Sequence, residues 1–578
     1  MDERRSTWGR WRRRPGSGIA ASVALIGALT VGFSSTGVAA VAAADWQDVI
    51  VTGPGGSHSA AAVVDHAGGR VIATLPLIDG VAARLPAGAT LPAGWFAAPQ
   101  RTLTTAAVTA ADTTKPVSTV RQTLGLPTQG TEGAGVTVAV VDTGVADVSD
   151  LTGRVTDRVN LTNGPGGDQH GHGTFMAGLI AGSGAGSAGA YRGVAPAANV
   201  VDVKVAGEQG ATDLITVMRG LQWVDDHRRQ IQVVNLSLSS GSPMPYQMDP
   251  LTQALEALWR KGIVVVVPSG NTGPGTGTVT SPGIDPTLLT VGGLDEAGTA
   301  SRADDGVAAW SGRGGRAQLS KPDLVAPGSH LVGLLAPGSE IDVAYPASHV
   351  GDHYMLGSGT SMSTAVTSGV VADVLSRRST LQPDAVKGLL TSTAYSAAGL
   401  TEPAAAGAGG LDAAQALSAA KSYQSGSKRA DMDAAALAAD AQGWRALDQA
   451  VNADDSLAAA AAWKQLSPQS RAWASRAWAD LDPTSRAWAS RAWASRAWAG
   501  GSSEDWVSRA WASRAWASRA WAGQDWSSRA WAGQDWASRA WASDAWSSRA
   551  WAGQDWASRA WASDSWSSRA WSWLPASP

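Results

Sequence analysis

Residues 136–142 read Val-Thr-Val-Ala-Val-Val-Asp, a nearly continuous apolar, β-branched run that ends in a carboxylate. Two similar runs follow, Val-Val-Asn-Leu at 233–236 and Ile-Val-Val-Val-Val at 263–267. Such runs are typical of strands that are buried on both faces of a parallel sheet. Stretches with a helical pattern lie between them, at 174–182, 212–227 and 250–261. This alternation predicts a doubly wound α/β domain with a mostly parallel sheet, whose functional residues gather at the carboxyl ends of the strands.

The 578 residues are too many for a single hydrophobic core, and changes in composition divide the chain into five parts. The predicted parts are an export signal (1–44), a small α+β domain (45–115), the doubly wound domain (116–420), an Ala-rich helical linker (421–470) and a Trp-rich repeat tail (471–578). The net charge of −3 gives no general signal for nucleic acid or another polyanion. The absence of cysteine excludes disulfides, thiolate metal sites and cysteine nucleophiles.

Residues 1–44 have the three-part pattern of an export signal. A basic segment rich in arginine, at 4–14, precedes a short apolar run at 19–31, and Ala42-Ala43-Ala44 before Asp45 fits a cleavage site. The alternative is an uncleaved anchor, although the apolar run is short for a membrane span. We therefore expect a secreted, extracellular protein.

Four polar residues stand at predicted strand ends or helix starts, in the order Asp142, His172, Asn271 and Ser361. A carboxylate at a strand end can fix the tautomer of an imidazole, and a histidine between glycines can accept a proton from a serine. An Asn side chain can donate to a developing oxyanion. Ser361 lies at a loop-to-helix junction, where free N–H groups and the positive helix end also favour an oxyanion.

Each of these residues also has a plainer interpretation. Ser361 could cap a helix, and Asp142 and Asn271 could form turns. His172 could belong to a metal site with His170, although no third ligand is evident. We expect His170 to be a solvated loop residue.

The order Asp, His, Asn, Ser and the motifs around it resemble those of subtilisin-like serine proteases. The motifs that carry this resemblance are Val141–Gly144, His172–Gly178, Gly193–Pro196, Val233–Leu238, Val267–Asn271, Ser281–Gly283, Lys321–Gly328 and Gly359–Met362. The resemblance implies a serine endopeptidase that is made as a zymogen and acts on proteins or peptides. It implies Asp142 as the orienting acid, His172 as the general base and then acid, and Ser361 as the nucleophile. It also implies an oxyanion hole formed by the Asn271 amide and the Ser361 N–H.

The resemblance further implies where substrate binds. The implied substrate-binding residues are Ser237, Leu238 and Ser239, as an edge that pairs with a substrate strand, and Ser269 and Gly270, as the other wall of the primary pocket. Two positions depart from the family pattern: Ala365 replaces a usual proline, and Ser239 replaces a frequent glycine and would narrow the pocket. No cofactor is required. Structural calcium is common in the family, but no loop of spaced carboxylates assigns a site here.

The domain at 45–115 resembles the propeptide of this family, most clearly at Ile78–Leu85. This resemblance implies that the protein cleaves itself between about residues 105 and 118. The alternative is a permanent accessory domain.

The tail repeats the unit Ser-Arg-Ala-Trp-Ala, with a tryptophan at every fifth position from Trp506 to Trp571. A period of five matches neither a helix nor a strand, so we expect a weakly ordered tail. Arg beside Trp can stack by cation–π contact, and aromatic faces can stack on sugar rings. The tail could hold the protein to a cell envelope or polysaccharide, or it could be a spacer or self-associating segment. A catalytically idle scaffold that adheres to a surface through this tail is the alternative to a protease.

Overall fold

The computed structural model describes residues 46–423, except 93, 106–118, 128–129, 131, 243–245 and 315–320, and also describes residues 443, 446, 458, 461, 462 and 465. The predicted export signal, the Trp-rich tail and the expected cleavage region after Thr105 lie outside the described residues. Most of the Ala-rich segment also lies outside them, and its six described residues are helical.

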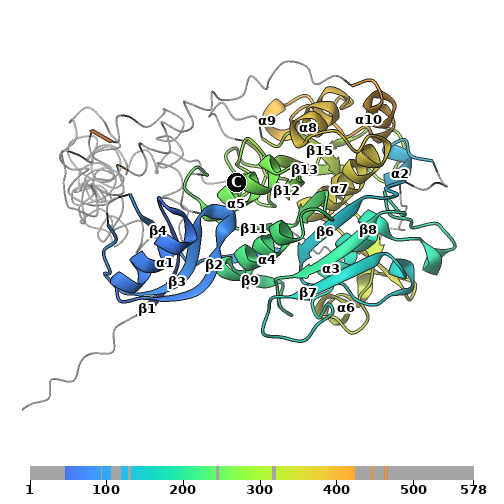
Figure 1. Ribbon diagram of the computed structural model, residues 1–578. Coiled ribbons are helices and arrows are strands. Elements are labelled where there is room, and N and C mark those ends of the chain that lie inside the picture. Colours follow the sequence, from blue (N-terminus) through green and yellow to red (C-terminus); the bar gives the residue numbers. More distant parts are fainter. Residues whose placement is uncertain are drawn as a thin grey trace, which may run out of the picture. The chain divides into compact units, whose positions relative to one another are not determined.

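A mostly parallel sheet forms the centre of the larger domain (Figure 1). Its strands are β6 (Thr137–Asp142), β7 (Val155–Asn160), β8 (Asn199–Lys204), β10 (Val233–Leu236), β12 (Val264–Pro268), β13 (Leu289–Asp295), β14 (Gly306–Val307) and β15 (Leu324–Pro327). The strand order is β14-β13-β12-β10-β6-β8-β7, with β15 also paired to β13. Each pair is parallel except β13 with β14. The predicted α/β fold is therefore confirmed.

Helices and smaller elements surround this sheet. The helices of the larger domain are α2 (Val120–Thr123), α3 (His172–Ala181), α4 (Leu214–Asp226), α5 (Pro250–Arg260), α6 (Glu340–Ala344), α7 (Thr360–Arg377), α8 (Pro383–Ser392), α9 (Pro403–Ala406) and α10 (Ala413–Ala420). Short 3₁₀ turns are η2 (Ser149–Leu151), η3 (Ala185–Ser187) and η4 (Pro346–Ser348), and a small antiparallel sheet joins β16 (Leu331–Leu334), β18 (Tyr354–Gly357) and β17 (His349–Val350). The three helices predicted at 174–182, 212–227 and 250–261 appear as α3, α4 and α5.

The helices cover both faces of the sheet, because successive residues of a strand point to opposite faces. A Cβ added at Gly220 of α4 would lie 3.9 Å from the Val141 side chain. A Cβ added at Gly173 of α3 would lie 3.2 Å from the Cβ of the next strand residue, Asp142. Therefore α3 and α4 lie on opposite faces of the sheet. α7 packs against α3, and α5 packs against α4.

α7 lies inside the core, and every residue from Thr360 to Leu375 is buried. Its many small side chains allow close packing: a Cβ added at Gly369 would lie only 2.6 Å from the Cβ of Val194. The helix packs on β10, β12, β13 and β15. The first turn of α7, which carries Ser361, is therefore held by the core of the larger domain.

Residues 46–99 form a four-stranded antiparallel sheet with one helix. The elements are β1 (Trp46–Thr52), α1 (Gly56–His66), β2 (Arg70–Leu75), η1 (Pro76–Ile78), β3 (Gly80–Pro86) and β4 (Phe96–Pro99), with strand order β2-β3-β1-β4. Val49 and Val51 belong to a small core that includes α1, whereas Ile50, on the opposite face, belongs to the main core. The sheet thus has α1 on one face and packs its other face on the larger domain, where η1 contacts α4 and α5.

A third sheet joins the segment after β4 to the larger domain. Its central strand, β5 (Thr102–Thr105), is antiparallel to both β11 (Leu238–Ser239) and β9 (Ala211–Asp213). Thr105 lies opposite Leu238, and Thr104 lies opposite Ser239. The edge that the sequence predicts to bind a substrate strand is therefore occupied by residues of the chain itself.

No helix in the described part of the chain is long and apolar enough to cross a membrane.

Candidate active site

The Asp142 carboxylate and the His172 imidazole are in direct contact at the carboxyl end of the sheet. Asp142 is the last residue of β6, and His172 is the first residue of α3. Nδ1 of His172 lies 2.7 Å from Oδ1 of Asp142, and both residues are buried. Because a carboxylate only accepts hydrogen bonds, Nδ1 carries a proton and Nε2 can act as a base. Nε2 has no hydrogen-bond partner among the described residues.

Ser361 is the second residue of α7, and the N-cap of this helix is Gly359, whose φ of 149° favours glycine. Its Oγ donates to the carbonyl oxygen of Ser237 at 3.2 Å, and Ser237 Oγ donates to the Ser361 carbonyl oxygen at 3.3 Å. The Ser361 hydroxyl is thus bonded to Ser237 and not to His172 in this structure. Catalytic hydrogen bonds often tighten only when a substrate is bound.

Asn271 is bonded to the residue that precedes Ser361. Its Oδ1 accepts hydrogen bonds from the backbone N–H of Thr360 at 3.0 Å and from the Thr360 hydroxyl at 2.9 Å. Both bonds are accepted by Oδ1, so the donor end of the amide, Nδ2, is not used in the contact with Thr360. The Asn271 side chain is therefore tethered to the first turn of α7.

The predicted substrate-binding residues fall into two groups. Leu238 and Ser239 pair with β5, and Ser237 holds the Ser361 hydroxyl. Ser269 and Gly270 lie after β12, where their carbonyl oxygens accept the N–H groups of Thr280 at 3.1 Å and Gly312 at 2.7 Å.

His170 differs from its predicted environment. It is only 8% exposed, and a Cβ added at Gly210 would lie 2.6 Å from its Nε2. The prediction of a solvated loop residue is therefore wrong, because the loop that carries Gly210 covers the ring. Burial lowers the pKa of His170, although Nε2 lies 3.5 Å from the Glu340 carboxylate. Within the described residues, no cluster of three or more His, Cys, Asp or Glu could hold a metal ion.

Asp168, for which the sequence predicts no role, connects the two segments that carry Asp142 and His172. One carboxylate oxygen accepts from the Thr143 hydroxyl at 2.8 Å and the Gly171 N–H at 2.7 Å. The other accepts from the N–H and the hydroxyl of Thr174 at 2.8 and 2.7 Å. The N-cap of α3 is Gly171, three residues after Asp168, so the sequence signal for Asp168 is only an Asp in a turn ahead of a predicted helix.

Buried charges also lie beneath the strand end. The ammonium of Lys204 donates to the Thr143 carbonyl oxygen, and burial lowers its pKa. Oδ2 of Asp202 accepts the Val145 N–H at 3.1 Å and lies 3.2 Å from the Arg158 guanidinium. Burial raises the pKa of Asp202 to about 7, against the opposing effect of Arg158. These groups support the turn that follows Asp142.

The raised pKa of Asp202 gives a testable pH dependence. In the unfolded chain an aspartate titrates near pH 4, so between about pH 4 and pH 7 the folded protein binds more protons. The contribution of Asp202 to the free energy of unfolding therefore decreases as the pH rises through that window. We expect Asp202→Asn to remove this decrease in stability, because the amide does not titrate. Melting temperatures should then shift in favour of the variant from about pH 4 to about pH 8. A constant difference across the series would contradict the assignment.

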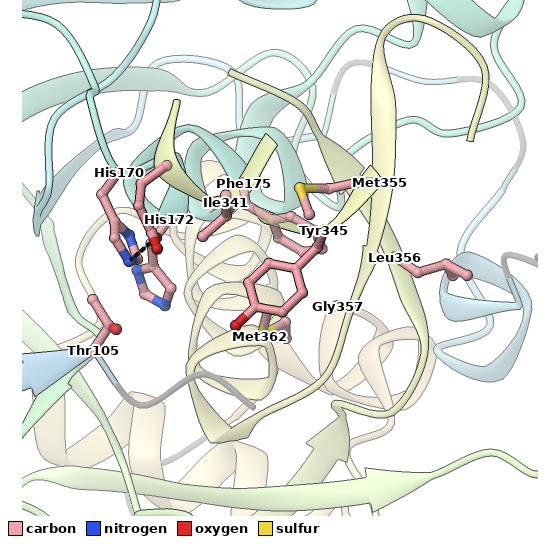
Figure 2. A pocket seen from close by; sticks show the side chains of 11 residues that line it. Thr105, His170, His172, Phe175, Ile341, Tyr345, Met355, Leu356, Gly357 and Met362 are labelled. Atoms are coloured by element: carbon pink, nitrogen blue, oxygen red, sulfur yellow. Dashed lines mark ion pairs between the residues drawn. The ribbon is translucent and has the colours of Figure 1, made fainter. Parts of the chain in front are cut away.

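A cavity of about 120 Å³ opens beside His172. Figure 2 shows Thr105, His170 and His172 at one end of the cavity, and Tyr345 and Met355 farther along it. Its other lining residues include Phe175, Ile341, Leu356 and Met362, so the walls are largely apolar. The last residue of β5 thus reaches the space next to the imidazole.

Comparisons with known proteins agree with this geometry. The model of the Subtilase family matches residues 133–417. The serine protease AprX of Bacillus subtilis is 44% identical over 270 residues, which cover 45% of this chain and 61% of AprX. Subtilisin Savinase of Lederbergia lenta is 31% identical over 268 residues, which cover 46% of this chain and 86% of that protein. The match therefore spans less than two thirds of AprX but most of Savinase.

Among solved structures, the chain is similar to fervidolysin from Fervidobacterium pennivorans, described as a keratinolytic enzyme related to subtilisin. The TM-score is 0.52 with 24% identity, over 65% of this chain and 61% of fervidolysin. At this identity the likeness supports the fold alone.

Proposed function

Because this chain belongs to the subtilase family, we propose that it is a serine endopeptidase with Ser361 as nucleophile and that it is made as a zymogen. The observation that carries the proposal is the buried 2.7 Å contact between Asp142 and His172. This contact lies at the carboxyl end of the sheet that also supports the first turn of α7. The idle-scaffold alternative has no observation in its favour among the described residues.

In the proposed mechanism, Ser361 Oγ leaves the Ser237 carbonyl and attacks the carbonyl carbon of the substrate. Nε2 of His172 accepts the hydroxyl proton, and the Asp142 carboxylate stabilises the imidazolium that forms. The Asn271 amide and the Ser361 N–H donate to the oxyanion of the tetrahedral intermediate. His172 then protonates the leaving amine, and a water molecule repeats the sequence on the acyl-enzyme.

The pairing of β5 supports the zymogen part of the proposal. Thr102–Thr105 fills the space between β9 and β11, with main-chain hydrogen bonds such as Thr105 N–H to the Gly210 carbonyl at 3.1 Å. A substrate strand could not pair with Leu238 and Ser239 while β5 remains there. Residues 45–105 would therefore block the site until the chain is cut and the segment leaves.

The register also narrows the expected cleavage position within the region predicted from the sequence. Thr105 lies opposite Leu238, and Ser237 holds the Ser361 hydroxyl. Continuing the antiparallel register by one residue would bring the chain after Thr105 to the nucleophile. We therefore expect the first cut at Thr105–Ala106 or Ala106–Ala107.

A secreted preparation tests the proposed function directly. We expect casein hydrolysis that a serine-directed inhibitor abolishes, and a mature N-terminus at Ala106 or Ala107 by mass spectrometry. Casein hydrolysis that persists after complete inhibitor treatment, or a full-length protein without any hydrolysis, would contradict the proposal.

The role of Asn271 gives a separate prediction. Asn271→Asp keeps Oδ1 for the two Thr360 bonds but replaces the amide donor with a carboxylate oxygen. We expect kcat to fall by about 10²–10³-fold with little change in KM, the size of loss known for the oxyanion-hole Asn of subtilisin. A rise in KM at constant kcat would instead assign Asn271 to ground-state binding.

We also propose that the protein is exported and that the Trp-rich tail holds it at a cell envelope or polysaccharide. The observations behind this are the export-signal pattern at 1–44 and the repeated Arg and Trp at 471–573. Cell-wall material should retain the full chain more strongly than a matched chain with the tail tryptophans replaced by alanine. Equal retention would leave the tail as a spacer.

A further inference from the structure

We propose that Asp249, Ser240 and Ser281 form an anionic subsite that binds a basic side chain of the substrate. The substrate residue is the one that lies where Arg101 lies now, four positions before Thr105. This inference rests on the proposed protease function and adds a preference for arginine at a stated position.

Arg101 already fills this subsite. Its Nη2 donates to both carboxylate oxygens of Asp249, at 2.7 and 2.8 Å, and its Nε donates to the Ser240 hydroxyl at 3.1 Å. The Arg101 side chain is 8% exposed and that of Asp249 is fully buried. The chain thus provides an example of the ligand that the site accepts.

Arg101 continues the strand that occupies the substrate edge. Its carbonyl oxygen accepts the N–H of Leu214 at 3.0 Å, next to the pairing of Thr102 with Asp213. Within β5, Leu103 is buried and Thr105 lines the cavity beside His172, whereas Thr102 and Thr104 are exposed. Because side chains alternate along a strand, Arg101 shares the enzyme-facing side with Leu103 and Thr105. A substrate bound in this register would direct the corresponding side chain to Asp249.

The receiving groups belong to the larger domain and are held independently of Arg101. Oδ1 of Asp249 caps α5 by accepting the Leu251 N–H at 3.0 Å, and Oδ2 accepts the Ser281 hydroxyl at 2.8 Å. The backbone N–H of Ser240 donates to the Ser281 carbonyl oxygen at 3.0 Å. The carboxylate is therefore already oriented when the strand leaves.

The charge balance favours a cation at this place. Leu251 and Ser281 are neutral donors, and Arg101 is the charged partner recorded for Asp249 among the described residues. A buried carboxylate without its cationic partner is costly, so a neutral side chain that covers Asp249 binds less well. Nη2 and Nε of one planar guanidinium bond Asp249 and Ser240 at the same time, which a single ammonium group does less well. This geometry predicts a preference for arginine over lysine.

The test uses internally quenched peptides with the sequence of residues 100–110, Gln-Arg-Thr-Leu-Thr-Thr-Ala-Ala-Val-Thr-Ala. One peptide keeps arginine, a second carries neutral citrulline of nearly the same shape at that position, and a third carries lysine. With the processed wild-type enzyme, kcat/KM for the arginine peptide should exceed that for the citrulline peptide roughly 10- to 100-fold. The lysine peptide should fall between them.

Asp249→Asn should bring the arginine-to-citrulline ratio close to one, since Asn keeps the helix cap and removes the charge. Asp412→Asn is the matched control, because Asp412 also caps a helix, α10, and pairs with an arginine, Arg302, at 2.6 Å. That control should keep the wild-type ratio.

The outcomes separate the subsite from the proposed function. Equal cleavage of the arginine and citrulline peptides by wild-type enzyme would overturn the subsite while leaving a protease, and this comparison stands even if Asp249→Asn does not fold. An unchanged ratio in a folded Asp249→Asn enzyme would also overturn it. Casein hydrolysis without cleavage of any of the three peptides would show that substrates do not bind in the register of β5, and would overturn the subsite with it. Loss of all hydrolysis, casein included, would refute the proposed function itself and the subsite with it.

Discussion

Ser361→Ala is expected to lower kcat for peptide hydrolysis by about 10⁶-fold, the loss known for the catalytic serine of subtilisin. The reason is that alanine has no hydroxyl that could attack the substrate and form the acyl-enzyme. The same variant should accumulate as an uncut precursor, since β5 then stays paired with β9 and β11. Rates on a quenched peptide and the mass of the purified protein measure both effects.

Ser363→Ala is the matched control for this variant. Ser363 lies two residues further along α7, is fully buried, and has no hydrogen-bond partner for its hydroxyl among the described residues. We expect it to be processed and active. If Ser361→Ala were trimmed at the same position and rate as the wild type, self-processing would be wrong even if peptide hydrolysis were lost.

Combining Ser361→Ala with His172→Ala should add almost nothing to the loss. In the proposed mechanism the two residues act in one proton transfer, so removing either one removes the step. A double variant that loses the product of the two single effects would show that the residues act independently.

Asp142→Asn is expected to lower kcat by about 10⁴-fold, a size known for this change in other serine proteases. If the Asn oxygen keeps the contact with Nδ1, the imidazolium lacks its counter-charge. The amide nitrogen then takes the buried position of Oδ2, which has no hydrogen-bond partner among the described residues. If the amide is reversed, its N–H group faces Nδ1 and forces the proton onto Nε2, which then cannot accept the proton of Ser361.

Asp150→Asn controls for the general cost of changing a buried carboxylate to an amide. Asp150 is 1% exposed and accepts the Tyr354 hydroxyl at 2.6 Å, in a network that does not include His172. Activity and melting temperature measured on both variants separate catalysis from stability. A loss of activity in Asp142→Asn that only tracks its loss of stability would contradict the assigned role.

The sequence was most informative where local pattern and burial coincide. The β-branched run ending at Asp142 predicted a strand buried on both faces, and all six residues of β6 are buried. The helical periodicity of the sequence predicted three helices, which appear as α3, α4 and α5 with bounds close to the predicted ones. These elements fix the fold and the places of Asp142 and His172, because a strand end and a helix start can be read from nearby residues.

Contacts between distant segments could not be read in this way. The burial of His170 depends on Gly210, and the Ser361 hydroxyl is held by Ser237, 124 residues away. The ion pair between Arg101 and Asp249 joins residues 148 apart, and neither residue has a local pattern that marks it. Sequence patterns record propensity and periodicity, whereas these contacts depend on how the chain brings separate turns together.

We propose that Ser361 is a nucleophile activated by His172 and Asp142, and a covalent probe of serine nucleophiles can identify it. The processed protein is treated with a fluorophosphonate and digested, and the modified residue is identified by mass spectrometry. We expect one stoichiometric adduct on Ser361, formed far more slowly in His172→Ala. An adduct on a different residue, or no adduct in a processed preparation that hydrolyses casein, would contradict it.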